Sequence, residues 1–101
     1  MVHHVIIWTL KDEYSEAEKE TIKQEIKEGL EGLQGKIPGL ELIQIRTEGL
    51  KSSTGELMLD SIFEDEASLK AYSANPLHCA VANEKVRPHV KIRSCFDYET
   101  R

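Results

Sequence analysis

The sequence has no long apolar run and only two cysteines. The first feature argues against a membrane-spanning protein, and the second argues against a disulfide-bonded one. No uninterrupted apolar stretch approaches the roughly 20 residues that a membrane-spanning helix needs, although 40% of the residues are hydrophobic. Cys79 and Cys95 form no C-x-x-C pair. In a short, charged chain without a signal-peptide-like start, such a pair is more typical of free thiols than of a disulfide. We therefore expect a cytoplasmic protein without a membrane partner.

The sequence also has no excess of positive charge. Thirteen Lys and Arg are dispersed among eighteen Asp and Glu, and the net charge is -5. No face is therefore expected to neutralise phosphate groups, which argues against nucleic acid as a partner. The four histidines and two cysteines show none of the close spacings that are typical of transition-metal sites. We expect no metal site.

The chain of 101 residues is long enough for one domain, 1–101, and too short for two. Four segments rich in β-branched and apolar residues, the last of them at the end of the chain, predict β-strands. Between them lie an amphipathic helix, begun by the capping pair Ser15 and Glu18, and a second helix with Asp65 at its N-cap. The order is strand 2–11, helix 16–34, strand 40–47, strand 57–64, helix 65–74 and strand 90–99. This β-α-β-β-α-β order predicts an α+β fold, the ferredoxin-like arrangement of an antiparallel sheet with both helices on one face.

The predicted strands carry apolar residues on both faces. Ile43 and Ile45 alternate with Leu40 and Leu42, and Ile92 and Phe96 lie along the last strand, together with Val90. In a ferredoxin-like layer the second face of the sheet has nothing of its own chain to pack on. We therefore expect this face to be buried against a second copy in a homodimer.

The stretch LKAYSANPLHCAVANEK, residues 69–85, predicts a helix that stops at Asn75-Pro76 and restarts just before His78. Pro76 forces a turn there, because it lacks an N–H and its ring disfavours the α conformation at Asn75. Across such a corner Tyr72 and His78 converge. A neutral imidazole suits proton transfer, and a tyrosine hydroxyl suits hydrogen bonding to an oxyanion. The spacing alone also fits, and more simply, a core tyrosine and a histidine that lines or caps the second helical piece.

His4 is predicted on the face of the first strand that also carries Ile6, Trp8 and Leu10. A histidine on an apolar face is more often a hydrogen-bonded core residue than a catalyst. Cys79, beside His78, points about 100° away on a helix and is expected to serve packing alone.

Taken in order, four segments resemble the stress-responsive dimeric α/β barrel family, the Dabb domains. They are HHVIIWTLKDEYSEAE at the start, IPGL at 37–40, SIFEDEASLKAYSANPLH at 61–78 and FDYE at 96–99. The third is similar to that family's F-x-s-x-e-x-L-x-x-Y-x-x-H-P-x-H segment. The resemblance implies a ferredoxin-like protomer whose sheet packs against that of a two-fold mate, so that the pair forms a dimeric α/β barrel.

The resemblance also implies a chemistry. One branch of the family cyclises polyketides by an intramolecular aldol condensation, with a histidine as acid–base and a tyrosine assisting in a pocket between sheet and helices. These roles would fall on His78 and Tyr72, with the strand histidine at His4 as a third catalytic residue. The family's histidine before the proline is Asn75 here. The expected lining of the pocket is Ile6, Trp8, Leu69, Asn75 and Phe96.

Three hypotheses follow. The first is a homodimer with a small apolar pocket that binds or converts a carbonyl-containing small molecule, by acid–base chemistry and without a cofactor. The second is a stress-associated dimeric binding or interaction protein without catalysis. The third, from fold analogy alone, is a cofactor-independent or haem-type monooxygenase of the wider superfamily of dimeric barrels. The sequence does not decide between enzyme and binder.

Overall fold

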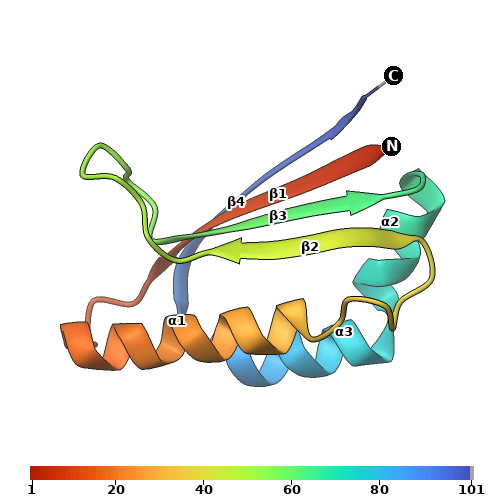
Figure 1. The fold of residues 1–101 in the computed structure, drawn as a ribbon. Helices are drawn as coiled ribbons and strands as arrows, with labels where there is room; N and C mark the ends of the chain where they lie inside the picture. The colour runs from red at the N-terminus through yellow and green to blue at the C-terminus, as the bar shows by residue number, and fades with distance from the viewer. Residues whose placement is uncertain (101) are drawn as a thin grey trace.

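The structure is a computed structural model that describes residues 1–100. Four strands form one sheet in the order β2-β3-β1-β4 (Figure 1). They are β1 (Val2–Leu10), β2 (Leu40–Arg46), β3 (Leu57–Phe63) and β4 (Val90–Glu99). All neighbouring strands are antiparallel, and β1 pairs with both β3 and β4. The predicted ferredoxin-like order of elements is confirmed.

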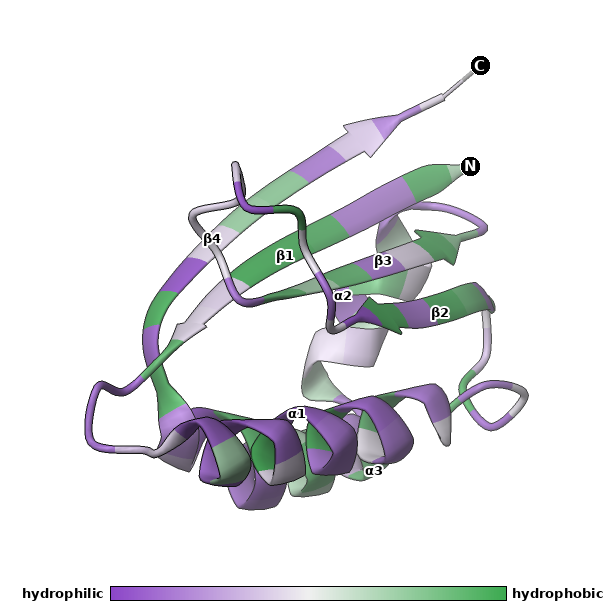
Figure 2. Ribbon diagram, turned by 60° about the vertical axis from the view of Figure 1, so that its left-hand side comes forward, coloured by the Kyte–Doolittle hydropathy of each residue, from purple (hydrophilic) through white to green (hydrophobic). Residues whose placement is uncertain are grey.

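The first helix, α1 (Glu16–Glu31), begins as the sequence predicts. The Ser15 hydroxyl accepts a hydrogen bond from the Glu18 backbone, and the Glu18 side chain accepts one from the Ser15 backbone. The helix buries Ile22, Ile26 and Leu30 in the core, and green apolar bands interrupt its otherwise hydrophilic ribbon (Figure 2). Each such side chain contributes about 1.5–3 kcal/mol by leaving water. The prediction that the helix runs to residue 34 is wrong, because the chain leaves the helix at Gly32 and continues in turns.

The second helical region has the predicted break. Helix α2 (Glu66–Ala74) is capped by Asp65, and α3 (Pro76–Val81) follows after Asn75. A π-helical turn (Ala82–Val86) and a 3₁₀ turn (Arg87–His89) then lead into β4. All these helices lie on the same side of the sheet as α1 (Figure 1), so one face of the sheet is covered and the other is not.

The strand register decides which residues face the helices. His4 pairs with Asp97 of β4, Ile6 with Cys95, and Trp8 with Arg93. Because directly paired residues of antiparallel strands share a face, Arg93, Cys95 and Asp97 lie on the helix side with His4. In β2 the predicted alternation is wrong at Leu40, which is buried like Ile43. The reason is a register shift between Leu40 and Leu42 that interrupts the alternation.

The opposite, helix-free face carries exposed apolar side chains. Its partly exposed members are Ile7, Ile92, Phe96 and Tyr98. The register of β1 with β4 places them together, since Phe96 pairs with Val5 and Tyr98 with His3. This face has the apolar character expected of a surface that meets another chain. Within residues 1–100 no helix is long and apolar enough to cross a bilayer.

Candidate functional site

The Asn75-Pro76 corner brings Tyr72 and His78 together. Asn75 has an extended backbone (φ -66°, ψ 129°), and its Oδ1 accepts a hydrogen bond of 2.9 Å from the Leu77 backbone. Asn75 thereby caps α3, and Pro76 occupies a first-turn position where its missing N–H costs nothing. The change of direction places the rings of Tyr72 and His78 with their centroids 4.1 Å apart. The two side chains predicted to converge do so.

The two rings line a cavity of about 120 Å³ between the sheet and the helices. Its walls come from every layer of the fold. The residues that line it are His4, Ile6, Trp8, Leu30, Leu59, Tyr72, Ser73, His78, Ala82, Val86, Arg87, Val90 and Arg93. The apolar residues form most of the interior, and the polar groups are few.

Two polar atoms at this cavity lack a protein partner. The Tyr72 hydroxyl and Nδ1 of His78 are buried and form no hydrogen bond with the residues that the structure describes. Tyr72 is only 1% exposed. A buried polar group without a partner costs about 1–3 kcal/mol, and most buried side-chain polar atoms are paired. Both atoms are therefore suited to hydrogen bond to a bound molecule.

Burial also fixes the protonation states of both groups. It raises the pKa of Tyr72 far above that of an exposed phenol, so the hydroxyl stays a hydrogen-bond donor. Burial is the largest cause and lowers the pKa of His78 below 6.5. A weak polar contact with the Ser73 backbone, which does not have the geometry of a hydrogen bond, raises the pKa, and the charges of Arg87, His4 and Arg93 lower it further. His78 is therefore a neutral imidazole at neutral pH, which is the form that accepts a proton.

His4 is buried beside this pair and is held by Asp97. Its Nδ1 lies 2.5 Å from Oδ1 of Asp97, and its ring centroid lies 6.3 Å from that of Tyr72. A carboxylate on Nδ1 favours the tautomer that carries its proton there, which leaves Nε2 as the acceptor. Asp97 thus orients the His4 ring.

Cys95 completes a group of possible metal ligands with His4 and Asp97, whose ligand atoms lie within 4.8 Å of one another. The absence of close spacings in the sequence did not anticipate this convergence. The separation of 2.5 Å between Nδ1 and Oδ1 nevertheless fits a hydrogen bond. Two ligands of one tetrahedral zinc, each about 2.0–2.2 Å from it, lie roughly 3.4 Å apart. Burial, the largest cause, also raises the pKa of the Cys95 thiol, which disfavours the thiolate that metals require.

Three of the predicted lining residues lie elsewhere. Phe96 lies on the helix-free face and is 70% exposed, because its register with Val5 turns it away from His4. Leu69 lines a separate surface hollow beside the chain termini, with Val2 and Tyr98. Asn75 uses its side chain to cap α3 and does not line the cavity.

Sequence reasoning missed Arg87, Arg93 and Asp97. Alternation along VKIRSCFDYE places Arg93, Cys95 and Asp97 on the face opposite Phe96. That signal was present in the sequence, but which of the two faces meets the helices depends on the register with β1. Arg87 follows a π-helical turn whose geometry leaves no clear sequence pattern.

Comparison with known families decides what kind of domain this is. The family model for the stress responsive A/B barrel domain, Dabb, matches residues 2–100. The chain belongs to the Dabb family. No curated relative matches the sequence.

Solved structures agree with the Dabb fold. A dimeric protein of unknown function with a ferredoxin-like fold from Bacteroides fragilis is 27% identical, with a TM-score of 0.89 over 98% of this chain and 95% of that one. A Dabb protein from Mesorhizobium loti is 19% identical, with a TM-score of 0.76 over 99% and 96%. Hydroxynitrile lyase from Passiflora edulis is 17% identical, with a TM-score of 0.71 over 96% and 90%. The last two likenesses describe the fold alone.

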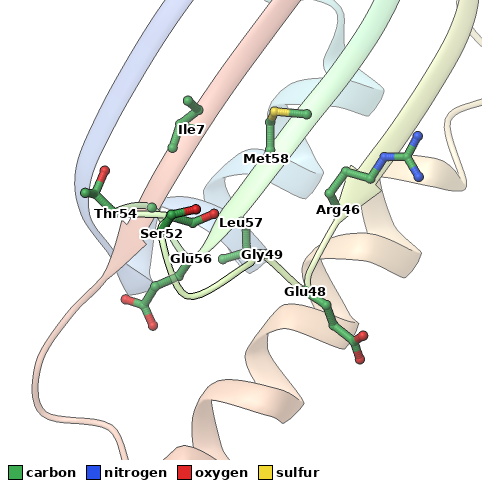
Figure 3. Close-up of a pocket in the computed structure, with 11 residues that line it drawn as sticks. Ile7, Arg46, Glu48, Gly49, Ser52, Thr54, Glu56, Leu57 and Met58 are labelled. Carbon is green, nitrogen blue, oxygen red and sulfur yellow. The ribbon is translucent and has the colours of Figure 1, made fainter.

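A second and larger hollow of this Dabb domain, about 450 Å³, lies on the helix-free face. The loop between β2 and β3 curls beside the sheet there, and Figure 3 shows Ile7, Met58 and Arg46 around it. Its acidic side chains include Glu56, which accepts a hydrogen bond from the Leu10 backbone and pairs with Lys19. No histidine, cysteine or tyrosine lines it. His4, Tyr72 and His78 line the smaller cavity instead.

Proposed function

We propose that this Dabb domain binds a small carbonyl compound between Tyr72 and His78 and transfers a proton at the carbon next to the carbonyl. The observation that carries the proposal is the pair of buried, unpartnered polar atoms at the cavity, the Tyr72 hydroxyl and Nδ1 of His78. One is a permanent donor and the other belongs to a neutral imidazole. A carbonyl and its neighbouring C–H bond offer the complementary groups.

The reaction follows from these two groups. The Tyr72 O–H donates a hydrogen bond to the carbonyl oxygen, and neutral His78 accepts the proton from the adjacent carbon. The electron pair of the broken C–H bond forms the C=C bond of an enolate, whose negative charge rests on the oxygen held by Tyr72. Return of the proton from the His78 imidazolium to carbon completes an enolisation. In an aldol reaction the enolate carbon instead attacks a second carbonyl, and the His78 imidazolium gives its proton to the alkoxide that forms. Neither step needs a redox cofactor.

His4 supports this arrangement from the floor of the cavity. Its hydrogen bond to Asp97 fixes the ring beside Tyr72, so its other nitrogen is held in place. We assign His4 the role of a second polar contact for the ligand or its leaving group. Ile6 and Trp8 supply apolar walls, which exclude water from the enolate.

The proposal includes the assembly and the location of the protein. The apolar helix-free face and the dimeric relative from Bacteroides fragilis support a homodimer. The dimer is proposed to stabilise the sheet that carries the cavity. We also propose a cytoplasmic location, in keeping with the charged composition.

The test uses pyruvamide and cyclopentanone, two neutral carbonyl probes of a size that suits the cavity. Binding is followed by the amide spectrum of ¹⁵N-labelled protein, and catalysis by exchange of the protons next to the carbonyl in D₂O. We expect shifts at residues around Tyr72 and His78, and exchange that is faster with protein than without it. His78→Gln is expected to abolish the added exchange, and Tyr72→Phe to reduce it about 10²-fold or more.

The outcomes separate the hypotheses. Binding without added exchange would favour the non-catalytic binding protein over the enzyme. Absence of binding by both probes, with the protein folded, would contradict the proposed function altogether. Lys36→Gln, a change at an exposed turn away from the cavity, is the control and is expected to behave as the unaltered protein does.

A further inference from the structure

The charged side chains that line the small cavity are two arginines. Arg87 and Arg93 line it together with His4 and His78, and its lining contains no aspartate or glutamate. This composition is unusual for a chain in which acidic residues outnumber basic ones by eighteen to thirteen. The nearest carboxylate, that of Asp97, is paired with His4 behind the lining, so the arginines are the charged groups that a ligand in the cavity meets.

Within residues 1–100, neither guanidinium forms an ion pair with a carboxylate. The ion pairs found among residues 1–100 involve lysines and His4, and none of them includes Arg87 or Arg93. Arg87 donates one hydrogen bond to the Asn83 amide oxygen, which leaves most of its five N–H groups available. Both arginines are exposed, whereas Tyr72 is buried. The positive charge therefore lies at the mouth of the cavity and the tyrosine hydroxyl lies inside.

From this arrangement we infer that the ligand is a small oxo-carboxylate, whose carboxylate binds Arg87 and Arg93 at the mouth while its carbonyl oxygen meets Tyr72. The inference rests on the proposed function and adds the charge of the ligand and its orientation. Arginine suits this role because its planar guanidinium hydrogen bonds to a carboxylate in a bidentate manner.

The size of the cavity limits the ligand as well. An apolar cavity of about 150 Å³ holds benzene, which has six non-hydrogen atoms, and the cavity here is about 120 Å³. The buried part of the ligand is therefore about five or six non-hydrogen atoms. A 2-oxo or 3-oxo acid of about that size carries both the carboxylate and the carbonyl that the inference requires.

The arginines also act on His78. Their charges contribute to the lowered pKa of its imidazole, after the larger effect of burial. A bound carboxylate offsets that charge and makes the imidazole a stronger base once the ligand is in place. Binding of an anion at the arginines is thus expected to raise the pKa of His78.

The experiment compares pyruvate with pyruvamide, which have nearly the same shape and differ in charge. Affinities are measured by NMR titration of the full-length protein at low and high salt. We expect pyruvate to bind about tenfold more tightly than pyruvamide at low salt, and the preference to shrink at high salt because the arginines are exposed. Arg93→Gln and Arg87→Gln are each expected to weaken pyruvate binding about fivefold or more and to leave pyruvamide within about twofold.

Two controls keep the result specific. Lys36→Gln removes the same unit of charge at an exposed turn and is expected to leave the preference unchanged. Arg87→Lys keeps the positive charge but removes the planar guanidinium that binds a carboxylate in a bidentate manner. It is expected to bind pyruvate less tightly than the unaltered protein and more tightly than Arg87→Gln.

Equal affinity for the two probes would overturn the anion site while leaving the proposed function intact. A preference that Lys36→Gln removes as fully as the arginine variants would also overturn it, because the overall charge would then be the cause. Failure of both probes to bind would contradict the proposed function itself.

Discussion

Tyr72 combines two properties that rarely occur together in one residue, almost complete burial and a hydroxyl without a hydrogen-bond partner among residues 1–100. Phe63 packs on its ring at a centroid distance of 5.0 Å, and His78 lies on another side at 4.1 Å. The ring therefore packs in the core, whereas the hydroxyl takes no part in that packing. At the scale of the residue, this separation of roles makes the function of the hydroxyl testable without disturbing the fold.

Tyr72→Phe is predicted to leave the free energy of unfolding unchanged or to raise it by up to about 1 kcal/mol, because it removes an unsatisfied buried group. Tyr14→Phe is the matched control. The Tyr14 hydroxyl lies 2.8 Å from Nδ1 of His89, so the same substitution is predicted to lower stability by about 1 kcal/mol. Urea denaturation measures both. If Tyr72→Phe is the more destabilising of the two, the hydroxyl serves the fold.

His78 is predicted to make stability depend on pH. Its pKa is lowered in the folded protein relative to 6.5, mainly by burial. As the pH falls through 6.5 the unfolded chain therefore takes up the proton first, and the free energy of unfolding decreases until the folded pKa is reached. Unfolding curves from pH 8 to pH 5 should show a shallower loss of stability for His78→Gln than for the unaltered protein. Identical slopes would count against a buried, neutral His78.

At the scale of the element, the sequence predicted what local periodicity and capping control. The strands, the capping box of Ser15 and the Asn-Pro corner follow from such patterns and were found. The end of α1 was predicted at residue 34 because Gly35 is a typical residue to end a helix, whereas the helix ends at Glu31 and is capped by Gly32. Phe96 was assigned to the wrong face because alternation gives two faces, and only the pairing of β4 with β1 tells which one meets the helices.

The candidate site was predictable only where it depends on local sequence patterns. The corner that joins Tyr72 and His78 is local, so its two residues could be paired from the sequence. The other charged residues of the site come from distant segments or irregular turns, and these are Asp97, Arg87 and Arg93. In the sequence, a charged residue at such a position looks the same as a charged residue on the solvent-exposed surface. Their position at the cavity depends on the three-dimensional structure.

Asn75→Ala is predicted to destabilise the protein by about 1 kcal/mol, because α3 loses the hydrogen bond from Leu77 to its cap. The same change lets the first turn of α3 fray, so binding of pyruvamide should weaken as His78 loses its position. Asn75→Ser retains a capping oxygen and should keep most of both properties. Urea denaturation and the NMR titration measure the two effects. Equal losses for Ala and Ser would show that the cap does not position His78.

At the scale of the whole molecule, the helix-free face is the largest feature that the chain does not cover. Ile7, Ile92, Phe96 and Tyr98 are all more than 40% exposed there. Side chains of this kind in one patch mark a surface for another protein, and a second copy presents the same patch about a two-fold axis. The cavity lies on the other side of the sheet, so the proposed dimer and the proposed ligand use separate surfaces.

Phe96→Asp is predicted to convert the homodimer into a monomer, because a charge at the centre of an apolar interface must be desolvated. Light scattering coupled to size exclusion measures the mass. Leu77→Asp is the control, since Leu77 is also exposed, at 49%, but lies on α3 on the helix side. If both variants keep the same mass as the unaltered protein, the helix-free face is not the dimer interface.

The central claim is that the Tyr72 hydroxyl meets a carbonyl oxygen inside the cavity. The most direct measurement is the ¹³C resonance of the carbonyl of labelled pyruvamide bound to the unaltered protein and to Tyr72→Phe. A hydrogen bond from the hydroxyl withdraws electrons from the carbonyl carbon, so the bound resonance should move downfield, and most of that shift should disappear in Tyr72→Phe. A bound resonance that is the same in both proteins would contradict the claim.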